Sequence, residues 1–220
     1  MRYSQAPEPD ATVMATAVKI CGITRVEDAL SAAHAGAHAI GLIFYPGSPR
    51  LVSHDIARRV VDALPAFVTP VALFVDAGPD EVKRVIAEVK PQLLQFHGAE
   101  SPEFCESFAV PYIKAAKVRQ GVDLLQYARR YRTAKGLLLD AFVDGSHGGT
   151  GSTFDWALIP DQLPLPLILA GGLHSDNVAD AIRRVHPWAV DVSSGVEAAK
   201  GIKDAARIAA FIRGVRNADV

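Results

Sequence analysis

Two short apolar segments, far apart in the chain, each carry near their end a side chain that can transfer a proton. Val18–Thr24 reads V-K-I-C-G-I-T and carries Cys21, while Leu137–Phe142 reads L-L-L-D-A-F and carries Asp140. A thiolate can remove a proton from carbon, and a protonated carboxyl group can donate one. If two parallel strands bring these residues to one site, the pair predicts acid–base catalysis.

Each role sets a condition on its side chain. A free thiol has a pKa of about 8.5, so a catalytic thiolate needs stabilisation, and a catalytic acid must hold its proton near neutrality. We therefore predict that Cys21 has a lowered pKa and that Asp140 stays protonated at pH 7. The alternatives are a buried structural cysteine and an aspartate that forms a turn or caps a helix. The position of Cys21 before Gly22 at a strand end favours the catalytic interpretation.

The elements that must position these residues follow an alternating pattern of short apolar runs and amphipathic stretches. The predicted strands are Ala17–Cys21, Ala39–Phe44, Val71–Val75, Leu93–Phe96, Tyr112–Lys117, Gly136–Asp140, Leu167–Ala170 and Ala189–Ser193. The predicted helices are Arg25–Ala35, Ser53–Ala63, Pro79–Val89, Ser101–Phe108, Val122–Arg130, a weak one at Trp156–Ile159, Ser175–Val185 and Lys203–Val215. Helix boundaries are indicated by N-cap serines, first-turn prolines and closing residues, namely Ser53, Ser101, Ser175, Pro79, Pro102, Gly36 and Pro91.

This order predicts an α/β fold in which eight parallel strands close into a (β/α)8 (TIM) barrel inside an outer ring of helices. An open doubly wound sheet is the alternative. No G-x-G-x-x-G follows the first strand, and candidate functional residues follow many strands, so the barrel is favoured. Active sites of such barrels lie at the carboxyl ends of the strands.

Three glycine-containing stretches follow the last three predicted strands. They include Gly149, Thr150 and Gly151, then Gly171 and Gly172, then Ser193, Ser194 and Gly195. Glycine allows backbone N–H groups to converge on an anion, and barrels often bind phosphate in these late loops. One such loop alone would be read as an ordinary turn. Together they predict a small phosphorylated ligand.

Composition excludes several classes of partner. The 220 residues are 50% hydrophobic and 21% charged, with a net charge of −1, so neither nucleic acid nor an anionic membrane is expected to bind. No apolar run is long enough to span a bilayer. The two cysteines, Cys21 and Cys105, and the scattered histidines give no disulfide framework or metal site, which favours the cytoplasm. Residues 1–16 are predicted to be a polar leader, and residues 17–220 the barrel domain.

Several motifs resemble those of the phosphoribosylanthranilate isomerase family, whose members are (β/α)8 barrels of tryptophan biosynthesis. The matching segments are V-K-I-C-G-I-T at Val18, G-L-I-F-Y-P-G-S-P-R ending at Arg50, Q-F-H-G at Gln95, L-L-L-D at Leu137, G-G-T-G-S-T-F-D-W at Gly148, L-A-G-G-L at Leu169 and V-D-V-S-S-G-V-E at Val190. They extend from Val18 to the last helix. Departures are Phe96 where leucine is expected, the unpatterned stretch at residues 144–147, and the leader.

The resemblance implies an Amadori rearrangement of N-(5-phosphoribosyl)anthranilate, with no metal or organic cofactor. It implies that Cys21 is the general base, that Asp140 is the general acid and that Arg50 binds the anthranilate carboxylate. The glycine loops would bind the phosphate. His97 follows a predicted strand and is a candidate ligand contact, with a buried structural histidine as the alternative. The sequence does not decide between a monomer and a homodimer.

Two other functions stay open at this stage. One is a related barrel acting on another phosphosugar, such as a ribulose-phosphate epimerase or the histidine-pathway isomerase. The epimerase would need metal-ligating His and Asp residues at strand ends. The histidine-pathway isomerase would carry an aspartate in place of Cys21. The second alternative is a phosphate-binding barrel without catalysis. The joint presence of Cys21, Asp140 and Arg50 argues against it.

Strand geometry adds one further expectation. Lys19 lies two residues before Cys21, so both side chains face the same side of their strand. An ammonium group below the thiol would favour the thiolate but would need its own counter-charge. Because the first and last strands are neighbours in a closed barrel, Asp191 is predicted to pair with Lys19.

Overall fold

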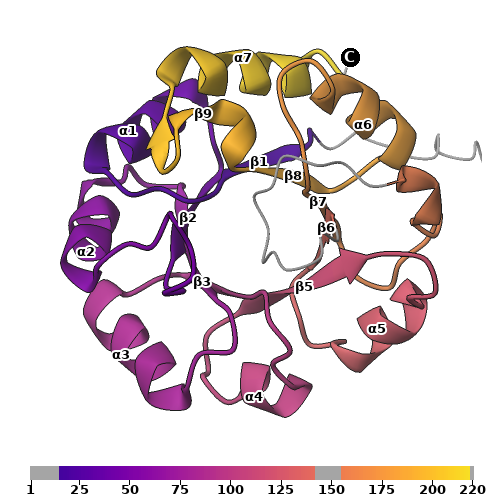
Figure 1. Cartoon of the computed structure of the whole chain (residues 1–220), viewed down its shortest axis with the longest axis horizontal. Coiled ribbons are helices and arrows are strands. Elements are labelled where there is room, and N and C mark those ends of the chain that lie inside the picture. Colours follow the sequence, from indigo (N-terminus) through magenta and orange to yellow (C-terminus); the bar gives the residue numbers. More distant parts are fainter. Residues whose placement is uncertain (1–14, 142–154, 219–220) are drawn as a thin grey trace, which may run out of the picture.

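The structure, a computed structural model, describes residues 15–141 and 155–218. In this part of the chain, eight parallel strands form a closed barrel in sequential order (Figure 1). They are β1 (Ala17–Ile20), β2 (Ala39–Ile43), β3 (Thr69–Phe74), β4 (Leu93–Phe96), β5 (Tyr112–Val118), β6 (Leu137–Ala141), β7 (Leu167–Leu169) and β8 (Ala189–Val192). The predicted barrel is confirmed, and the predicted strands differ from the observed ones only at their ends.

Helices surround this barrel as an outer ring (Figure 1). They are α1 (Val26–Ala35), α2 (His54–Ala63), α3 (Pro79–Val89), α4 (Pro102–Glu106), α5 (Leu124–Arg130), α6 (Val178–Val185) and α7 (Ala205–Arg216). Between β6 and β7 the described residues contain only the 3-10 helix η1 (Trp156–Leu158), where the sequence predicted a weak helix. A second 3-10 helix, η2 (Ser194–Val196), follows β8.

Side chains along each strand point alternately outward, into the apolar core between strands and helices, and inward, into the barrel. In β1, Val18 and Ile20 pack outward in the main apolar core, between the strands and the helices. Lys19 and Cys21 therefore point into the barrel, as their spacing predicted. In β8 the alternation is the same, since Val190 and Val192 belong to the outer core. Asp191 is thus left on the inside.

Ring closure places these inward residues side by side. Parallel pairing of β1 with β8 sets Lys19 opposite Asp191. Their side chains form a buried ion pair, with 2.9 Å between Lys19 Nζ and Asp191 Oδ1. The predicted Lys19–Asp191 pair is confirmed.

Most of the predicted helix boundaries are confirmed by their caps. Ser53 and Ser101 each accept a hydrogen bond from a backbone N–H of the first turn, and Gly36 ends α1 with a φ of 104°. Ser175 was wrong as an N-cap, because α6 begins at Val178 after Asn177. The Asn177 side chain accepts from His174 N and donates to Gly172 O, which holds the preceding residues in a turn.

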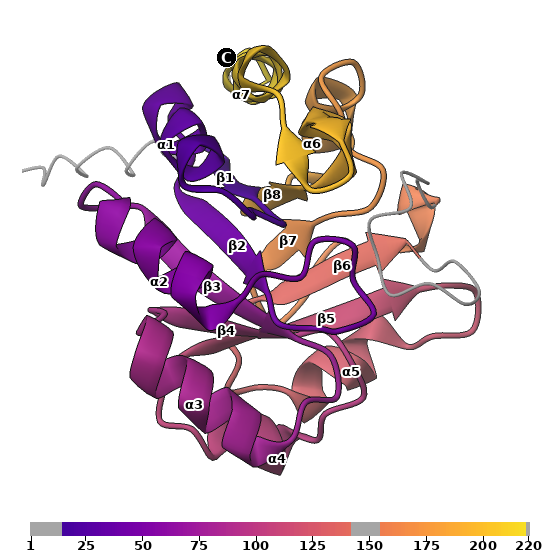
Figure 2. The ribbon, with the colours of Figure 1, turned by 60° about the vertical axis from the view of Figure 1, so that its left-hand side comes forward.

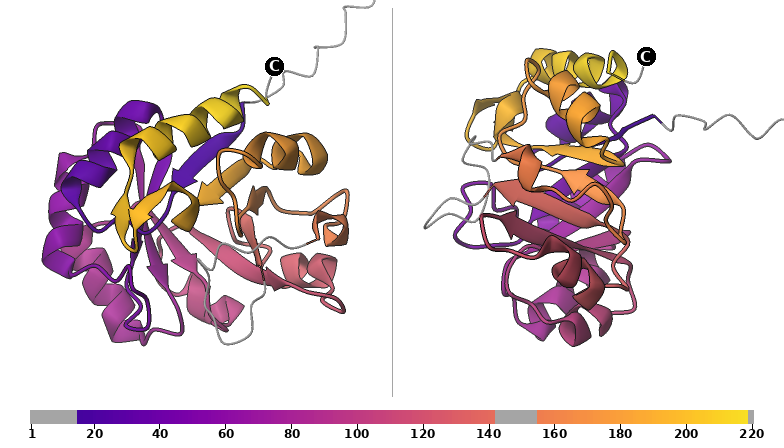
Figure 3. Two further views of the ribbon diagram at one scale, coloured as in Figure 1. Left: turned by 45° about the horizontal axis from the view of Figure 1, so that its top comes forward. Right: turned by 90° about the vertical axis from the view of Figure 1, so that its right-hand side faces the viewer.

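A short hairpin that the sequence did not predict follows η2. Strands β9 (Glu197–Ala199) and β10 (Ile202–Lys203) pair antiparallel, and Gly201 between them has a φ of 78°. In Figure 3 (right) this yellow hairpin and the loop after β2 lie on the side toward which the strand arrows point. Figure 2 shows the loop after β2 projecting from that same side. These segments therefore sit around the carboxyl ends of the strands.

Two glutamates of α3 hold the first residue of α2. His54 Nδ1 lies 2.6 Å from Glu88 Oε2, and His54 Nε2 lies 2.9 Å from Glu81 Oε1. Partial burial opposes the imidazolium, but the hydrogen bonds and charges of Glu88 and Glu81 outweigh it and raise the pKa of His54. The charged imidazole therefore stabilises the contact between α2 and α3.

We expect this contact to depend on pH. Because the folded-state pKa of His54 lies above its unfolded value, the stabilisation is fully present below the unfolded pKa of about 6.5 and is lost as pH rises through the folded pKa. The measurement is the free energy of unfolding of the wild type and His54→Gln in urea, from about pH 5 to pH 9. The advantage of the wild type should shrink with rising pH, and a difference independent of pH would contradict the expectation.

In residues 15–141 and 155–218, no helix combines the length and apolar character needed to cross a bilayer.

Candidate active site

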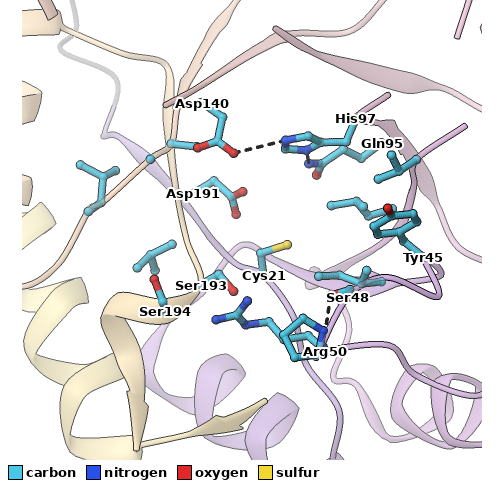
Figure 4. A pocket seen from close by; sticks show the side chains of 18 of the residues that line it. Cys21, Tyr45, Ser48, Arg50, Gln95, His97, Asp140, Asp191, Ser193 and Ser194 are labelled. Atoms are coloured by element: carbon cyan, nitrogen blue, oxygen red, sulfur yellow. Dashed lines mark hydrogen bonds and ion pairs between the residues drawn. The ribbon is translucent and has the colours of Figure 1, made fainter. Parts of the chain in front are cut away.

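A cavity of about 260 Å³ opens at the carboxyl ends of the barrel strands. It is lined by residues from segments throughout the barrel, among them Cys21, Tyr45, Ser48, Arg50, Gln95, His97, Asp140, Asp191, Ser193 and Ser194 (Figure 4). Cys21, which directly follows β1, and Asp140 in β6 therefore share one site, as predicted. Figure 4 shows both pointing into the cavity.

Cys21 lies at the end of β1, close to Gly41 and to the ammonium group of Lys19. Its N–H donates to Val192 O at 2.8 Å, which fixes the chain at the end of β1. A Cβ on Gly41, in the neighbouring strand β2, would lie 2.7 Å from Cys21 Sγ and 3.1 Å from Lys19 Nζ. Glycine at position 41 thus leaves the room in which the thiol and the ammonium group lie together.

The electrostatic surroundings of Cys21 correct one expectation. Burial raises the pKa of the Cys21 thiol, and although the Lys19 ammonium favours the thiolate, it does not outweigh burial. The predicted lowering of this pKa is therefore wrong for the free protein, because the cost of desolvating the thiolate exceeds the attraction of a cation already paired with Asp191. Burial also opposes the charge of Lys19, but Asp191 and then Cys21 raise the pKa of that lysine.

Opposite Cys21, Asp140 is accompanied by two buried polar side chains. Asp140 Oδ1 accepts a hydrogen bond from Ala141 N at 2.8 Å, and its Oδ2 lies 3.2 Å from His97 Nε2. Gln95 Nε2 lies 3.0 Å from His97 Nδ1. Among the described residues, Gln95 Oε1 and His97 Nε2 have no hydrogen-bond partner, so both atoms are available to a polar ligand.

Arg50 is fixed by a carboxylate that lies outside the cavity lining. Its Nε and Nη2 donate to Glu197 Oε1 and Oε2 at 2.7 and 2.8 Å. Its stem crosses Gly22, where a Cβ would approach Arg50 Cδ to 2.5 Å and where φ is 75°. Because Gly22 has no side chain, the Arg50 side chain can pass over it and reach the cavity. Figure 4 shows the guanidinium group beside Ser193, which also lines the cavity.

The predicted phosphate loops are placed only in part. Gly171 and Gly172, with φ of 83° and 63°, line the cavity together with Ser193 and Ser194. Gly195 does not line it. It packs below, where a Cβ would overlap the carbonyl oxygen of Leu173. The remaining predicted residues, Gly149, Thr150 and Gly151, lie outside the described residues.

Sequence reasoning missed several groups at this site. Gln95 was quoted only as part of a motif, although its spacing of two from His97 on a strand indicates a shared face. Glu197 belongs to the matched segment at Val190, but nothing in the sequence pairs it with Arg50. Within the described ranges, no group of three or more His, Cys, Asp or Glu side chains could hold a metal ion.

The family model for N-(5′-phosphoribosyl)anthranilate (PRA) isomerase matches residues 18–214. A protein of that name from Nitrosospira multiformis is 61% identical over 202 residues, which are 92% of this chain and 97% of the relative. Its counterpart from Pseudomonas syringae pv. tomato is 58% identical over 197 residues, covering 90% and 96% of the two chains.

Solved structures agree with these relatives. The crystal structure of phosphoribosyl anthranilate isomerase from Thermotoga maritima has a TM-score of 0.85 and 41% identity, and covers 92% of this chain and 99% of that one. A second crystal structure of this type of isomerase contains reduced 1-(o-carboxyphenylamino)-1-deoxyribulose 5-phosphate. It has a TM-score of 0.82 and 41% identity, with the same coverage of 92% and 99%.

Proposed function

Because the chain belongs to the N-(5′-phosphoribosyl)anthranilate isomerase family, we propose that Cys21 and Asp140 are the general base and general acid of its reaction. The protein is an isomerase of tryptophan biosynthesis that converts N-(5′-phosphoribosyl)anthranilate to 1-(2-carboxyphenylamino)-1-deoxyribulose 5-phosphate. The observation that carries the assignment of residues is that Cys21 and Asp140, delivered by β1 and β6, line one cavity at the carboxyl ends of the strands.

The reaction needs one acid and one base. In the proposed first step, Asp140 donates a proton to the ring oxygen of the ribose as the C1′–oxygen bond breaks and a C1′ iminium forms. Cys21, as the thiolate, then removes the proton from C2′, which the adjacent iminium has made acidic. The enolamine that results tautomerises to the C2′ ketone. The iminium group thus accepts the electron pair, a role that an organic cofactor has in other enzymes.

The remaining cavity residues would bind the two anionic ends of the substrate. We assign Arg50 to the anthranilate carboxylate, which its guanidinium can bind by charge-assisted hydrogen bonds. Gly171, Gly172, Ser193 and Ser194 would bind the phosphate, together with Gly149, Thr150 and Gly151, which lie outside the described residues. His97 would contact the sugar, because its Nε2 lies beside the proposed acid and has no hydrogen-bond partner among the described residues.

The direct test is turnover of authentic substrate, followed by loss of the fluorescence of its anthranilate group. Complementation of a host that lacks only this step of tryptophan biosynthesis tests the activity in the cell. Binding without turnover would instead support the non-catalytic phosphate-binding barrel.

The raised pKa of Cys21 makes Lys19 important to the proposed base. We expect Lys19→Met to raise the pKa of the thiol further, because the nearest cation is removed while burial remains. The measurement is the rate of alkylation by iodoacetamide as a function of pH, and the curve should move to higher pH. Cys105 does not interfere, since burial raises its pKa to about 12.

Lys19→Arg serves as the control for this experiment. It keeps a positive charge beside Asp191 and should shift the alkylation curve less than Lys19→Met does. Circular dichroism verifies that both variants are folded, because Lys19→Met leaves Asp191 buried without its partner. An alkylation curve for Lys19→Met that coincides with the wild-type curve would remove Lys19 from this role.

Three broader assignments complete the proposal. The partner is a small phosphorylated molecule, as in the structure of the related isomerase that contains a reduced phosphorylated compound. A cytoplasmic location is proposed because Cys21 and Cys105 are free thiols. We also retain residues 17–220 as one catalytic domain. Dimeric phosphoribosylanthranilate isomerase from Thermotoga maritima has been converted to monomers, and the oligomeric state of this chain can be measured by analytical ultracentrifugation.

A further inference from the structure

Glu197 is a buried carboxylate outside the cavity that contacts two cations of the site. It receives hydrogen bonds from Arg50 at 2.7 and 2.8 Å and from Lys203 Nζ at 2.8 Å. Glu197 begins the β9–β10 hairpin and Lys203 ends it, so the hairpin itself carries the cluster. Lys203 Nζ also donates to Ser193 O at 3.0 Å. The cluster thereby connects Arg50 with the loop that follows β8.

The charges in this cluster do not cancel. Two cations share one carboxylate, which leaves one positive charge beside the cavity. Burial opposes the carboxylate, but the hydrogen bond from Arg50 and the charge of Lys203 outweigh it and lower the pKa of Glu197. Glu197 is therefore ionised at neutral pH. Burial lowers the pKa of Lys203 although Glu197 favours its charge, whereas the hydrogen bond to Glu197 raises the pKa of Arg50. Arg50 is thus the cation of this cluster that is available to an anionic ligand.

The geometry determines which part of the Arg50 guanidinium that ligand can reach. Glu197 takes Nε and Nη2, which are the donors along one edge of the group. In the described part of the chain, Nη1 has no such partner, and the guanidinium lies beside Ser193, which also lines the cavity (Figure 4). A free arginine side chain has many rotamers, whereas one held in a bidentate pair is preorganised for its next partner.

We propose that Glu197 is a positioning residue that fixes Arg50 so that its Nη1 edge receives the carboxylate of the substrate. The proposal rests on the assigned role of Arg50 in carboxylate binding. It implies that the β9–β10 hairpin contributes to the selection of a carboxylated ligand although no residue of the hairpin lines the cavity. Without Glu197 the guanidinium would be free to turn toward other anions, including the phosphate group and the Cys21 thiolate.

The test compares two ligands with four proteins. The ligands are reduced 1-(o-carboxyphenylamino)-1-deoxyribulose 5-phosphate and its counterpart without the ring carboxylate. The proteins are the wild type, Glu197→Gln, Arg50→Met and the double variant, and the measurements are Kd by calorimetry and the separate effects on KM and kcat. Glu197→Gln should weaken the carboxylated ligand and raise KM by about 10- to 100-fold, as for loss of hydrogen bonds to a charged group. The Kd of the other ligand and kcat should change less than threefold.

Two comparisons separate positioning from general loosening. In the Arg50→Met background, Glu197→Gln should have no further effect on the carboxylated ligand, because its route of action is already removed. Glu197→Asp, which keeps the charge, should recover part of the affinity. Glu100→Gln breaks another buried ion pair, with Lys114, and should leave the ratio of the two affinities unchanged.

The outcomes distinguish failure of the positioning role of Glu197 from failure of the carboxylate-binding role of Arg50. Equal weakening of both ligands by Glu197→Gln, or a loss confined to kcat, would overturn the positioning role. If Arg50→Met does not change the ratio of the affinities, the assigned role of Arg50 fails instead. Should Glu197→Gln not fold, Glu197→Gln with Lys203→Met restores the charge balance, and the same comparison of ligands is made with that protein.

Discussion

Replacement of Cys21 by alanine, or of Asp140 by asparagine, is expected to lower kcat by at least about 100-fold with little change in KM. A positioned acid or base contributes about 10²- to 10⁴-fold to a rate. Alanine at position 21 cannot accept the C2′ proton. Asparagine at position 140 keeps the shape of the side chain and can still accept from Ala141 N, but it cannot donate a proton to the ring oxygen. The measurement is steady-state kinetics by anthranilate fluorescence.

Cys105→Ala is the matched control for the first substitution. Cys105 is also a buried free thiol, but it lies in α4 and does not line the cavity. Its replacement should leave kcat within a few-fold of the wild type. Near-full activity of Cys21→Ala or Asp140→Asn would exclude that residue from its proposed role.

Gly195→Ala is expected to weaken substrate binding strongly although Gly195 does not line the cavity. A Cβ at this position would overlap the backbone carbonyl of Leu173, and backbone cannot move aside as the end of a side chain can. The loops carrying Gly172 and Ser194 would be forced apart. Overpacking costs about 1–3 kcal/mol of stability, and a displacement of about 1 Å at a site can cost about 100-fold in rate.

The kinetic measurement for Gly195→Ala is KM, supported by inhibition with inorganic phosphate. Both should show weaker binding of phosphate, with KM raised by about 10- to 100-fold for a displacement of this size. Gly78→Ala is the control, because a Cβ there meets nothing within 4 Å and φ is −67°. A KM equal to that of the wild type in Gly195→Ala would contradict a role for these loops in phosphate binding.

Local patterns in the sequence account for much of the fold and for part of the site. The strands follow from their short apolar runs, and Ser53 and Ser101 cap their helices as their positions indicate. Side chains alternate along a strand, and the first and last strands of a closed barrel are neighbours. These two facts were enough to pair Lys19 with Asp191. These inferences use only chain geometry and the topology of a closed barrel.

The remainder depends on contacts that no local pattern specifies. Arg50 and Glu197 are 147 residues apart, and Glu197 lies in a hairpin too short to give a periodic signal. His97 approaches Asp140 only because β4 and β6 contribute to one cavity. The direction of the pKa shift of Cys21 was also beyond the sequence, because it depends on how completely the thiol is removed from water.

Ring closure through β1 and β8 also bears on the order in which the newly made chain becomes active. Lys19 is among the first residues of the barrel to be synthesised, yet the carboxylate that balances its charge comes 172 positions later. While the chain is still growing, this ammonium group has to remain hydrated, and the buried Lys19–Asp191 pair beside Cys21 cannot form. Isomerase activity should therefore arise only after the final strand has docked, so that its appearance reports completion of the barrel during translation.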